Sequence, residues 1–193
     1  MHRYGHGCSR HLRIPALIGP ALIESEALRG ESLGTWWKRL RFNFFPAYWG
    51  TGAKVTYISE DLRTIRIKLP LNFRTRNIYG TLFGGAMYAA IDPLYPIIIK
   101  VGLGSGYDIW DKAGSIRYFK PGRSTLFAEC SMGAQELAAL KARLEAEPSV
   151  DVDKEIELVD AGGVVHAVVQ KTIYVARKGA GRRSRTEQDS GRR

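Results

Sequence analysis

One carboxylate stands apart from the other charged groups of this sequence. Asp92 is the only formally charged residue between Arg76 and Lys100, and it follows the glycine pair Gly84-Gly85 within the most apolar run of the chain. A carboxylate can accept a proton, and glycine at the start of a helix lets a ligand approach the unpaired N–H groups there. A base and a site for a developing oxyanion are parts that acyl-transfer chemistry uses.

A helix from about Phe83 to Val101 would carry both groups. Its apolar residues recur at intervals of three and four and cover nearly every side, so other elements must wrap it. Pro93 and Pro96 lie in its interior, and neither has a backbone N–H. The carbonyls of Ala89 and Asp92 therefore lose their usual partners, and we expect a kink near Asp92.

The sequence neighbours of Asp92 suggest a dry environment. Because Ile91, Leu94 and Tyr95 are apolar, we expect the carboxyl to be desolvated, which favours its neutral form and suits a proton acceptor near physiological pH. The alternative is structural: the carboxylate satisfies a freed carbonyl or a neighbouring hydroxyl at the proline kink.

Strand patterns flank this helix on both sides. Residues 52–70 predict a hairpin in which Ala53, Val55 and Tyr57 face inward. Residues 108–119 and 124–132 predict an antiparallel pair joined by the turn at 120–123. Residues 150–159 and 164–175 predict a last hairpin, with His166 on a sheet face rather than in a catalytic role.

Two further helices complete the expected fold. Residues 134–146 predict a short amphipathic helix, and residues 32–45 predict another that ends at Pro46. The second places Trp36 or Trp37, Leu40 and Phe44 on one face, which packs on the sheet or else forms a lid over a pocket or a membrane-surface contact. The sequence therefore predicts an α+β fold in which a six-stranded antiparallel sheet wraps a long apolar helix.

Charge and composition place the functional part in residues 32–176. The net charge of +10 divides into +5 for residues 177–193, +2 for residues 1–30 and only +3 for the rest, so the basic balance belongs to the ends of the chain. We expect residues 1–31 to be a flexible leader and residues 177–193 a disordered tail, with no nucleic acid as partner.

The cysteines and apolar runs exclude several classes of protein. Cys8 and Cys130 form neither a disulfide framework nor a zinc site, and His2, His6, Cys8 and His11 lack a scaffold for a functional metal. We expect a cytoplasmic protein. The apolar run at 14–23 lacks a signal-peptide cleavage site, and the charge, prolines and glycines in residues 78–99 argue against stable membrane insertion.

The order of Asn77, Gly84-Gly85 and Asp92 resembles the Asn, His-Gly-Gly, Asp pattern of hotdog-fold acyl-CoA thioesterases of the phenylacetate-pathway type. The likeness covers residues 36–177. Three stretches resemble an uncharacterised branch of that superfamily, labelled as a domain of unknown function or as a tetrameric acyl-CoA thioesterase: Gly80-Thr-Leu-Phe-Gly-Gly-Ala-Met-Tyr-Ala-Ala-Ile-Asp-Pro, Trp110-Asp-Lys-Ala and Arg117-Tyr-Phe-Lys-Pro-Gly-Arg.

The resemblance implies a homodimer or homotetramer with an active site between two subunits. Gly84 would supply the oxyanion donor, Asp92 the base or nucleophile, and Asn77 a polar contact to the thioester or to water. Gly84 and Asp92 lie eight residues apart on one helix, which is about 12 Å at 1.5 Å per residue. One subunit's pair is thus too far apart to hold a single carbonyl, and the partner must supply one of them.

The sequence departs from the pattern at Phe83, where characterised relatives have a His that contacts the substrate. The resemblance implies that Phe83 and Gly85 occupy substrate-binding positions in this chain. Asp111 stands near the position at which some relatives have a Ser or Thr that positions water. The alternative role for Asp111 is structural, as an ion pair with Lys112 or Arg117. No cofactor is implied apart from coenzyme A as part of the substrate.

Three basic residues flank the turn at 120–123. Arg117, Lys120 and Arg123 would meet the phosphates of coenzyme A, or else remain solvated. The resemblance thus implies a thioester hydrolase; the alternatives are an acyl or acyl-CoA binding protein without catalysis, which the loss of the His at Phe83 favours, and a purely structural oligomer.

Overall fold

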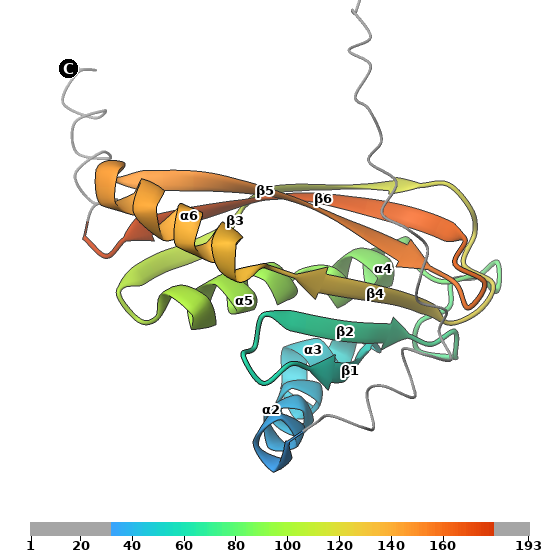
Figure 1. The fold of residues 1–193 in the computed structure, drawn as a ribbon. Helices are drawn as coiled ribbons and strands as arrows, with labels where there is room; N and C mark the ends of the chain where they lie inside the picture. Colours follow the sequence, from blue (N-terminus) through green and yellow to red (C-terminus); the bar gives the residue numbers. More distant parts are fainter. Residues whose placement is uncertain (1–31, 180–193) are drawn as a thin grey trace, which may run out of the picture.

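The computed structural model describes residues 32–179, and the expectations for the leader, its His and Cys residues and most of the basic tail lie outside this range (Figure 1). The described elements follow in chain order: α2 (Leu33–Phe44), α3 (Pro46–Thr51), β1 (Lys54–Ile58), β2 (Thr64–Leu69), α4 (Gly84–Ile91), α5 (Leu94–Leu103), β3 (Tyr107–Tyr118), β4 (Leu126–Ser131), α6 (Ala134–Ala146), β5 (Ser149–Val159) and β6 (Val165–Arg177).

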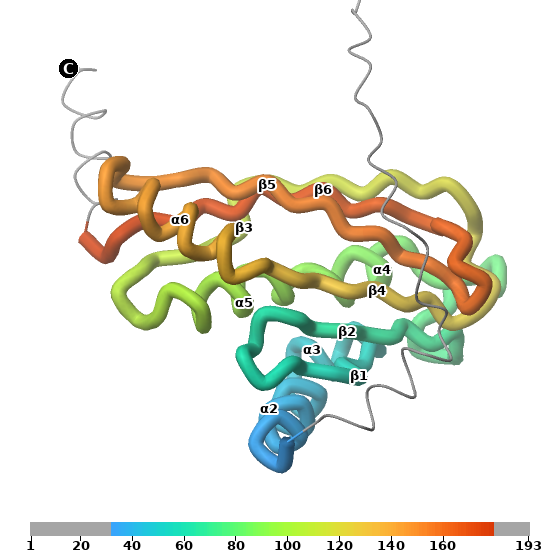
Figure 2. The backbone as a smooth tube through the Cα atoms, in the orientation of Figure 1, coloured from blue at the N-terminus to red at the C-terminus, as the bar shows by residue number. Residues whose placement is uncertain are grey.

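The six strands form one antiparallel sheet in the order β1-β2-β4-β5-β6-β3. Figures 1 and 2 show the sheet curling around α4 and α5, which follow one another through its concave side. This arrangement confirms the predicted fold. The central segment Gly84–Leu103 is long and apolar enough to span a membrane by composition alone. In this fold it is instead the core helix, as the wrapped pattern predicts.

The core forms where inward-facing strand residues meet α4 and α5. Ala90, Ile91, Leu94 and Ile99 on the central helices have no exposed surface, and alternate residues of β2, β4, β5 and β6 pack against them. Burying such side chains stabilises the fold by roughly 1.5–3 kcal/mol each relative to exposure. The short helix α6 occupies the predicted residues and adds Leu140 and Leu144 to this core.

The predicted pairing of residues 108–119 with 124–132 is wrong. β3 pairs with β6 at one edge of the sheet, whereas β4 lies between β2 and β5. The connection after β3 crosses the start of α4, where the N–H of Leu82 donates to the carbonyl of Gly122 at 2.8 Å. Alternation identifies the buried face of a strand but not its neighbour, so a turn motif between two strands does not establish a hairpin.

Tyr57 is a second correction. The register of β1 against β2 shifts between Val55 and Tyr57, which is a β-bulge, so Ile58 rather than Tyr57 faces the core. Ile58 is 5% exposed. The ring of Tyr57 instead contacts Arg66, whose Cζ atom lies 5.0 Å from the centroid of that ring. One extra residue in a strand exchanges the two faces for every residue beyond it.

The aromatic face of α2 does not pack on the sheet of this chain. Trp37 and Phe44 are more than half exposed, and the helix is fixed instead by Asn43, whose side chain accepts from the N–H of Val55 at 2.7 Å and donates to the carbonyl of Val55 at 2.9 Å. The amide side chain thus occupies the outer edge of β1. The helix ends before Pro46 as expected, but Pro46 then begins α3, which the pattern did not predict.

Gly52 ends α3 in a left-handed conformation, and we predict that it cannot be replaced. With φ at 79°, a Cβ at position 52 would lie 2.3 Å from Cγ2 of the buried Thr75. Gly52→Ala should therefore lower the free energy of unfolding by about 1–3 kcal/mol, measured by urea denaturation.

Gly50 is the matched control for this substitution. It lies on the same helix, and a Cβ added at this position would have no other atom within 4 Å. Gly50→Ala should raise stability by about 0.5–1 kcal/mol, the usual difference between these residues in a helix. Equal effects of the two substitutions would contradict the assigned conformation.

Candidate functional site

The kink expected in the central helix is present between α4 and α5. α4 ends at Ile91 and α5 begins at Leu94, so Asp92 and Pro93 form the break. Because Pro96 has no N–H, the carbonyl of Asp92 lacks its helical partner. The ammonium group of Lys171 donates a hydrogen bond to this carbonyl instead.

Lys171 is the residue that the sequence analysis missed. It occupies an inward position of β6 between Val169 and Ile173, and its side chain has no exposed surface. Its Nζ also lies 3.1 Å from Oδ1 of Asp92 and 2.7 Å from Oδ2 of Asp111. Together with the Asp92 carbonyl, these oxygens give each of the three ammonium protons an acceptor.

Asp92 is less buried than its sequence neighbours suggest. Ile91, Leu94 and Tyr95 face the core with at most 5% exposure, while the side chain of Asp92 points away from them and is 49% exposed. The expectation of a desolvated carboxyl is therefore wrong for this chain. A half-exposed carboxylate held by a buried cation stays open to water and to a ligand.

Asp111 is the drier of the two carboxylates. Burial raises its pKa, the hydrogen bond and charge of Lys171 act in the opposite direction, and the charge of Asp92 raises it further. Its Oδ1 is buried without a hydrogen-bond partner among the described residues. The expected pairing with Lys112 or Arg117 is wrong, since Asp111 pairs with Lys171 and Lys112 lies 2.5 Å from Asp151.

Tyr88 completes this group of four, which we call the Lys171 cluster: Lys171, Asp92, Asp111 and Tyr88. The ring of Tyr88 lies with its centroid 5.8 Å from Nζ of Lys171. Its hydroxyl packs so closely on β3 that a Cβ at Gly114 would lie 2.0 Å from it. Burial is the main cause that raises the pKa of Tyr88, so the phenol stays protonated at neutral pH.

The N-terminus of α4 is the second part of the candidate site. Phe83 is the N-cap and Gly84 the first helical residue, so the N–H groups of Gly84, Gly85 and Ala86 are the free donors of a first helical turn. The ring of Phe83 lies over Gly85, and the hydroxyl of Tyr118 lies over Gly84, where a Cβ would be only 2.6 Å from it. A ligand that reaches Gly84 therefore meets Tyr118, which the sequence analysis did not single out.

Asn77 organises the loop before α4. Its Oδ1 accepts from the N–H of Tyr79 at 2.9 Å and of Thr81 at 3.2 Å, and its Nδ2 donates to Oγ1 of Thr81 at 2.9 Å. These bonds hold the chain in the conformation that leads into Gly84. Contact of Asn77 with a thioester or water stays a prediction.

The basic residues proposed for phosphate binding lie at the end of β3 and in the connection after it. Arg117, Lys120 and Arg123 are all exposed. The connection is held by His166, whose Nδ1 lies 3.1 Å from the carbonyl oxygen of Pro121 and whose Nε2 lies 3.0 Å from Oδ2 of Asp160. His166 thus has a structural place on the sheet, and phosphate binding by the three cations stays a prediction.

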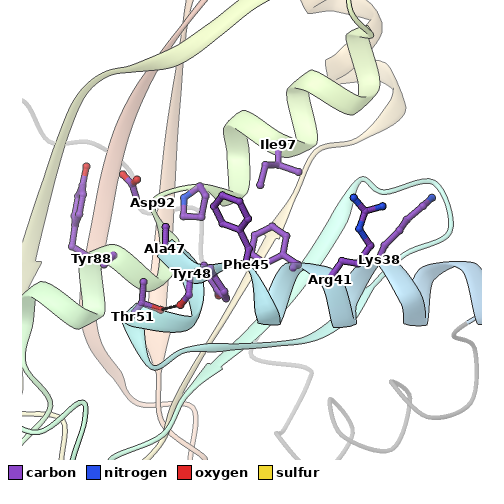
Figure 3. A pocket seen from close by; sticks show the side chains of 12 residues that line it. Lys38, Arg41, Phe45, Ala47, Tyr48, Thr51, Tyr88, Asp92 and Ile97 are labelled. Carbon is purple, nitrogen blue, oxygen red and sulfur yellow. Dashed lines mark hydrogen bonds between the residues drawn. The ribbon is translucent and has the colours of Figure 1, made fainter.

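A cavity of about 830 Å³ opens beside Asp92 (Figure 3). Tyr88 and Asp92 lie at one end and Lys38 and Arg41 at the other, with Phe45, Ala47, Tyr48 and Ile97 between them. Phe42 and Pro93 also belong to the apolar lining. α2 and α3 form one wall of this cavity. The interpretation of residues 32–45 as a lid or as a membrane-surface contact stays a prediction.

Other chemistry has little support in the described part of the chain. Between positions 32 and 179 no group of three or more His, Cys, Asp or Glu residues is arranged to hold a metal ion. Cys130 is fully buried, and desolvation raises the pKa of its thiol to about 12, so it is not an activated nucleophile.

Comparisons with known proteins agree with this architecture. A family model described as "Domain of unknown function (DUF4442)" matches residues 35–175. No curated protein matches the sequence.

Three solved structures show the likeness. A Pseudomonas aeruginosa protein of unknown function, described as a probable thioesterase, is 15% identical with a TM-score of 0.67, over 74% of this chain and 95% of that one. A Haemophilus influenzae thioesterase is 14% identical with a TM-score of 0.55, over 76% and 93%. The PaaI protein of the Escherichia coli phenylacetic acid degradation operon is 15% identical with a TM-score of 0.50, over 74% and 93%. At this identity the likeness shows a shared hotdog fold.

Loss of the buried ammonium should destabilise the protein strongly. Lys171→Met leaves the carbonyl of Asp92 without its donor and Asp111 without a counter-ion, which typically lowers the free energy of unfolding by about 3–5 kcal/mol. Urea denaturation measures this, with Lys112→Met as control, since its pair with Asp151 is exposed to solvent and screened by it, and so contributes little to stability. Adding Asp111→Asn to Lys171→Met should restore part of the loss; no recovery would contradict the electrostatic cause.

Asp111 should make stability depend on pH. Its pKa is raised above the ordinary 3.8 in the folded protein, so its contribution to stability is fully present below pH 3.8 and is lost as the pH rises through the raised value. Asp111→Asn has no such titration. The melting temperature of the wild type minus that of the variant should therefore fall as the pH rises from 3.8 through this window, and a constant difference would contradict the raised pKa.

Proposed function

Because the chain belongs to the family described as "Domain of unknown function (DUF4442)", whose description assigns no activity, we propose a function from its site: it is an acyl-CoA thioesterase that hydrolyses its substrate at an interface between two subunits. One observation carries the proposal. The cavity of about 830 Å³ ends at a half-exposed carboxylate, Asp92, that a buried ammonium holds in place. The fold shared with solved proteins that are named thioesterases supports it.

Asp92 is the proposed base. Lys171 binds Oδ1, which leaves Oδ2 to take a proton from an attacking water molecule. The water oxygen bonds to the thioester carbon and the carbon–sulfur bond breaks, so the acid is released and the proton passes to the leaving thiolate. Tyr88 lies at the same end of the cavity and limits the space in which the water can sit.

Gly84 of the partner subunit is the proposed oxyanion donor. Free N–H groups and the positive end of the helix dipole suit the charge that develops on the carbonyl oxygen. Phe83 replaces the expected His with an exposed ring, but it leaves this backbone donor in place. Within one chain Gly84 and Asp92 stand about two helical turns apart, so the proposal needs a second subunit.

The edge strand β3 is the surface proposed for that second subunit. It runs for 12 residues at the border of the sheet, and most of its side chains are exposed. An edge of this length presents unpaired N–H and C=O groups to another strand. Arg117 at its end, with Lys120 and Arg123 beyond it, would then lie near the shared site and meet the coenzyme A phosphates.

A second candidate is a protein that binds acyl-CoA without hydrolysing it. The specific observation in its favour is Phe83, whose ring is 57% exposed at the start of α4 where the resemblance expects a polar side chain. In that case Asp92 has a purely structural part in the Lys171 cluster. Tight binding of acyl-CoA with no release of thiol would select this candidate.

Asp92→Asn separates the two candidates. The amide keeps the size of the side chain but cannot act as a base, so we expect kcat to fall by on the order of 10²–10⁴. Thiol release from a panel of acyl-CoA thioesters measures the rate, and circular dichroism and thermal denaturation check the fold. Asp151→Asn is the control, because this carboxylate pairs with Lys112 on the exposed face of the sheet. Unchanged hydrolysis by Asp92→Asn would refute the assignment.

The same variant tests whether the site is shared. Subunits with Asp92→Asn lack the base, and in subunits with Gly84→Ala the added Cβ, which would lie 2.6 Å from the hydroxyl of Tyr118, obstructs the approach to the N–H group, so each should be inactive. Mixed by co-refolding, they should regain activity at about a quarter of the sites, because half of the dimers are mixed and each mixed dimer has one intact site. Mixtures that stay inactive while exchanging subunits would place both groups of a site within one chain.

A further inference from the structure

The cavity beside Asp92 has an apolar middle between two polar ends. Its walls come from three places: α2 and α3 on one side, and the α4–α5 break on the other (Figure 3). The aromatic ring of Phe45, in the joint between α2 and α3, is 62% exposed and lines this space with Ile97. An apolar occupant would therefore remove aromatic and aliphatic surface from water.

Two hydroxyl groups of the α3 wall are already engaged in hydrogen bonds. The hydroxyl of Tyr48 donates to the carbonyl of Ala90 at 3.2 Å. The hydroxyl of Thr51 donates to the carbonyl of Tyr48 at 2.7 Å and accepts from the N–H of Ala53 at 3.1 Å. A polar arm with amide groups, such as pantetheine, would leave those amides short of hydrogen-bond partners here, which is unfavourable for a buried polar group.

The far end of the cavity is a cationic rim. Lys38 and Arg41 are exposed residues of α2, so their charged ends reach water while their hydrocarbon stems extend the apolar wall. They lie away from Asp92 in Figure 3. A chain bound from Asp92 toward this rim thus stays in contact with carbon atoms along its length.

We propose that this cavity holds the acyl chain of the substrate, and that the chain is a straight aliphatic one of medium to long length. The inference rests on the proposed function for the position of the thioester at Asp92, and it adds the substrate class. The volume of about 830 Å³ lies in the upper part of the range of ligand pockets, about 300–1,000 Å³. Coenzyme A then leaves the site on the opposite side, toward the partner's start of α4.

Chain length is the first test. Across butyryl-, octanoyl-, dodecanoyl- and hexadecanoyl-CoA, KM should fall by up to about fourfold for each added methylene, which corresponds to about 0.8 kcal/mol per buried CH₂, until the chain fills the cavity. Phenylacetyl-CoA should be a poorer substrate than dodecanoyl-CoA. A flat dependence on length with good turnover of butyryl-CoA would overturn the inference and leave the thioesterase proposal standing.

Ala47→Trp is the second test, because Ala47 is an exposed residue of α3 that lines the cavity. A ring there blocks the apolar middle, so the ratio of kcat/KM for dodecanoyl-CoA to that for butyryl-CoA should fall by about tenfold or more. The matched control is Leu33→Trp, a residue of α2 that is 82% exposed and outside the lining. The control should leave the ratio unchanged; an unchanged ratio in Ala47→Trp as well would overturn the inference.

Binding without turnover separates this inference from the proposed function. Isothermal titration calorimetry with S-dodecyl-CoA, a thioether that cannot be hydrolysed, should show binding to the wild type and binding weakened about tenfold or more in Ala47→Trp. That result without hydrolysis of any thioester would refute the enzyme and retain the cavity as a lipid-chain site. Equal binding of S-dodecyl-CoA and S-methyl-CoA would refute the cavity as the chain site whether or not the protein is an enzyme.

Discussion

The rest of this structure depends on one fully buried ammonium group, that of Lys171. An unpaired charge in a protein interior is so unfavourable that it persists only with close counter-charges and hydrogen-bond acceptors. Lys171 finds them in the carbonyl and carboxylate of Asp92 and the carboxylate of Asp111. The three acceptors belong to the break of the central helix and to β3, while the lysine belongs to β6. One side chain therefore joins the helix to the outer half of the sheet.

The same interaction explains why the central helix can break where it does. Two prolines within four positions remove backbone donors, so the carbonyls one turn earlier need other hydrogen-bond partners. Lys171 supplies one donor from the sheet, and this contact also fixes Asp92 with its carboxylate turned out of the core. On the other side of the break, Tyr48 bonds to the carbonyl of Ala90 and ties α3 to α4. The cavity is the space that these two attachments leave between the helices.

The sequence predicts the local parts of this fold well and the non-local parts less well. The wrapped helix, its kink, α6 and the hairpins of β1–β2 and β5–β6 each follow from periodicity, prolines and short turns within one stretch of chain. The place of β4 between β2 and β5, and of β3 beside β6, depends on contacts between distant segments, which alternation does not specify. The β-bulge that exchanges Tyr57 and Ile58 is a single extra residue with no distinct signal.

In the candidate site, too, the residues that are close together in the sequence could be predicted, and those that are far apart could not. Asp92, Gly84 and Asn77 are predicted from their order and spacing along one stretch, and their roles stay predictions. Lys171 lies far along the chain, and its signal is only that it takes an inward position in the alternation Val169-x-Lys171-x-Ile173. A charged residue in such a position requires a buried partner, and the structure shows that Asp111 and Asp92 are those partners. Tyr88 and Tyr118 carry no such signal, because aromatic residues are ordinary in a core.

The side chain of Asn43 has a consequence for how copies of this protein assemble. Asn43 occupies both main-chain hydrogen-bonding groups of Val55, and α2 lies along that border of the sheet. Of the two borders in the described part of the chain, the one at β1 is therefore sealed and the one at β3 is open. A sheet with a single open border can pair once with a second copy about a two-fold axis. After that pairing, no edge strand with free backbone N–H and C=O groups remains. If copies of the chain pair through β3 as proposed, both borders of the combined sheet are β1 strands that Asn43 and α2 cover, so growth by strand addition would stop at the pair.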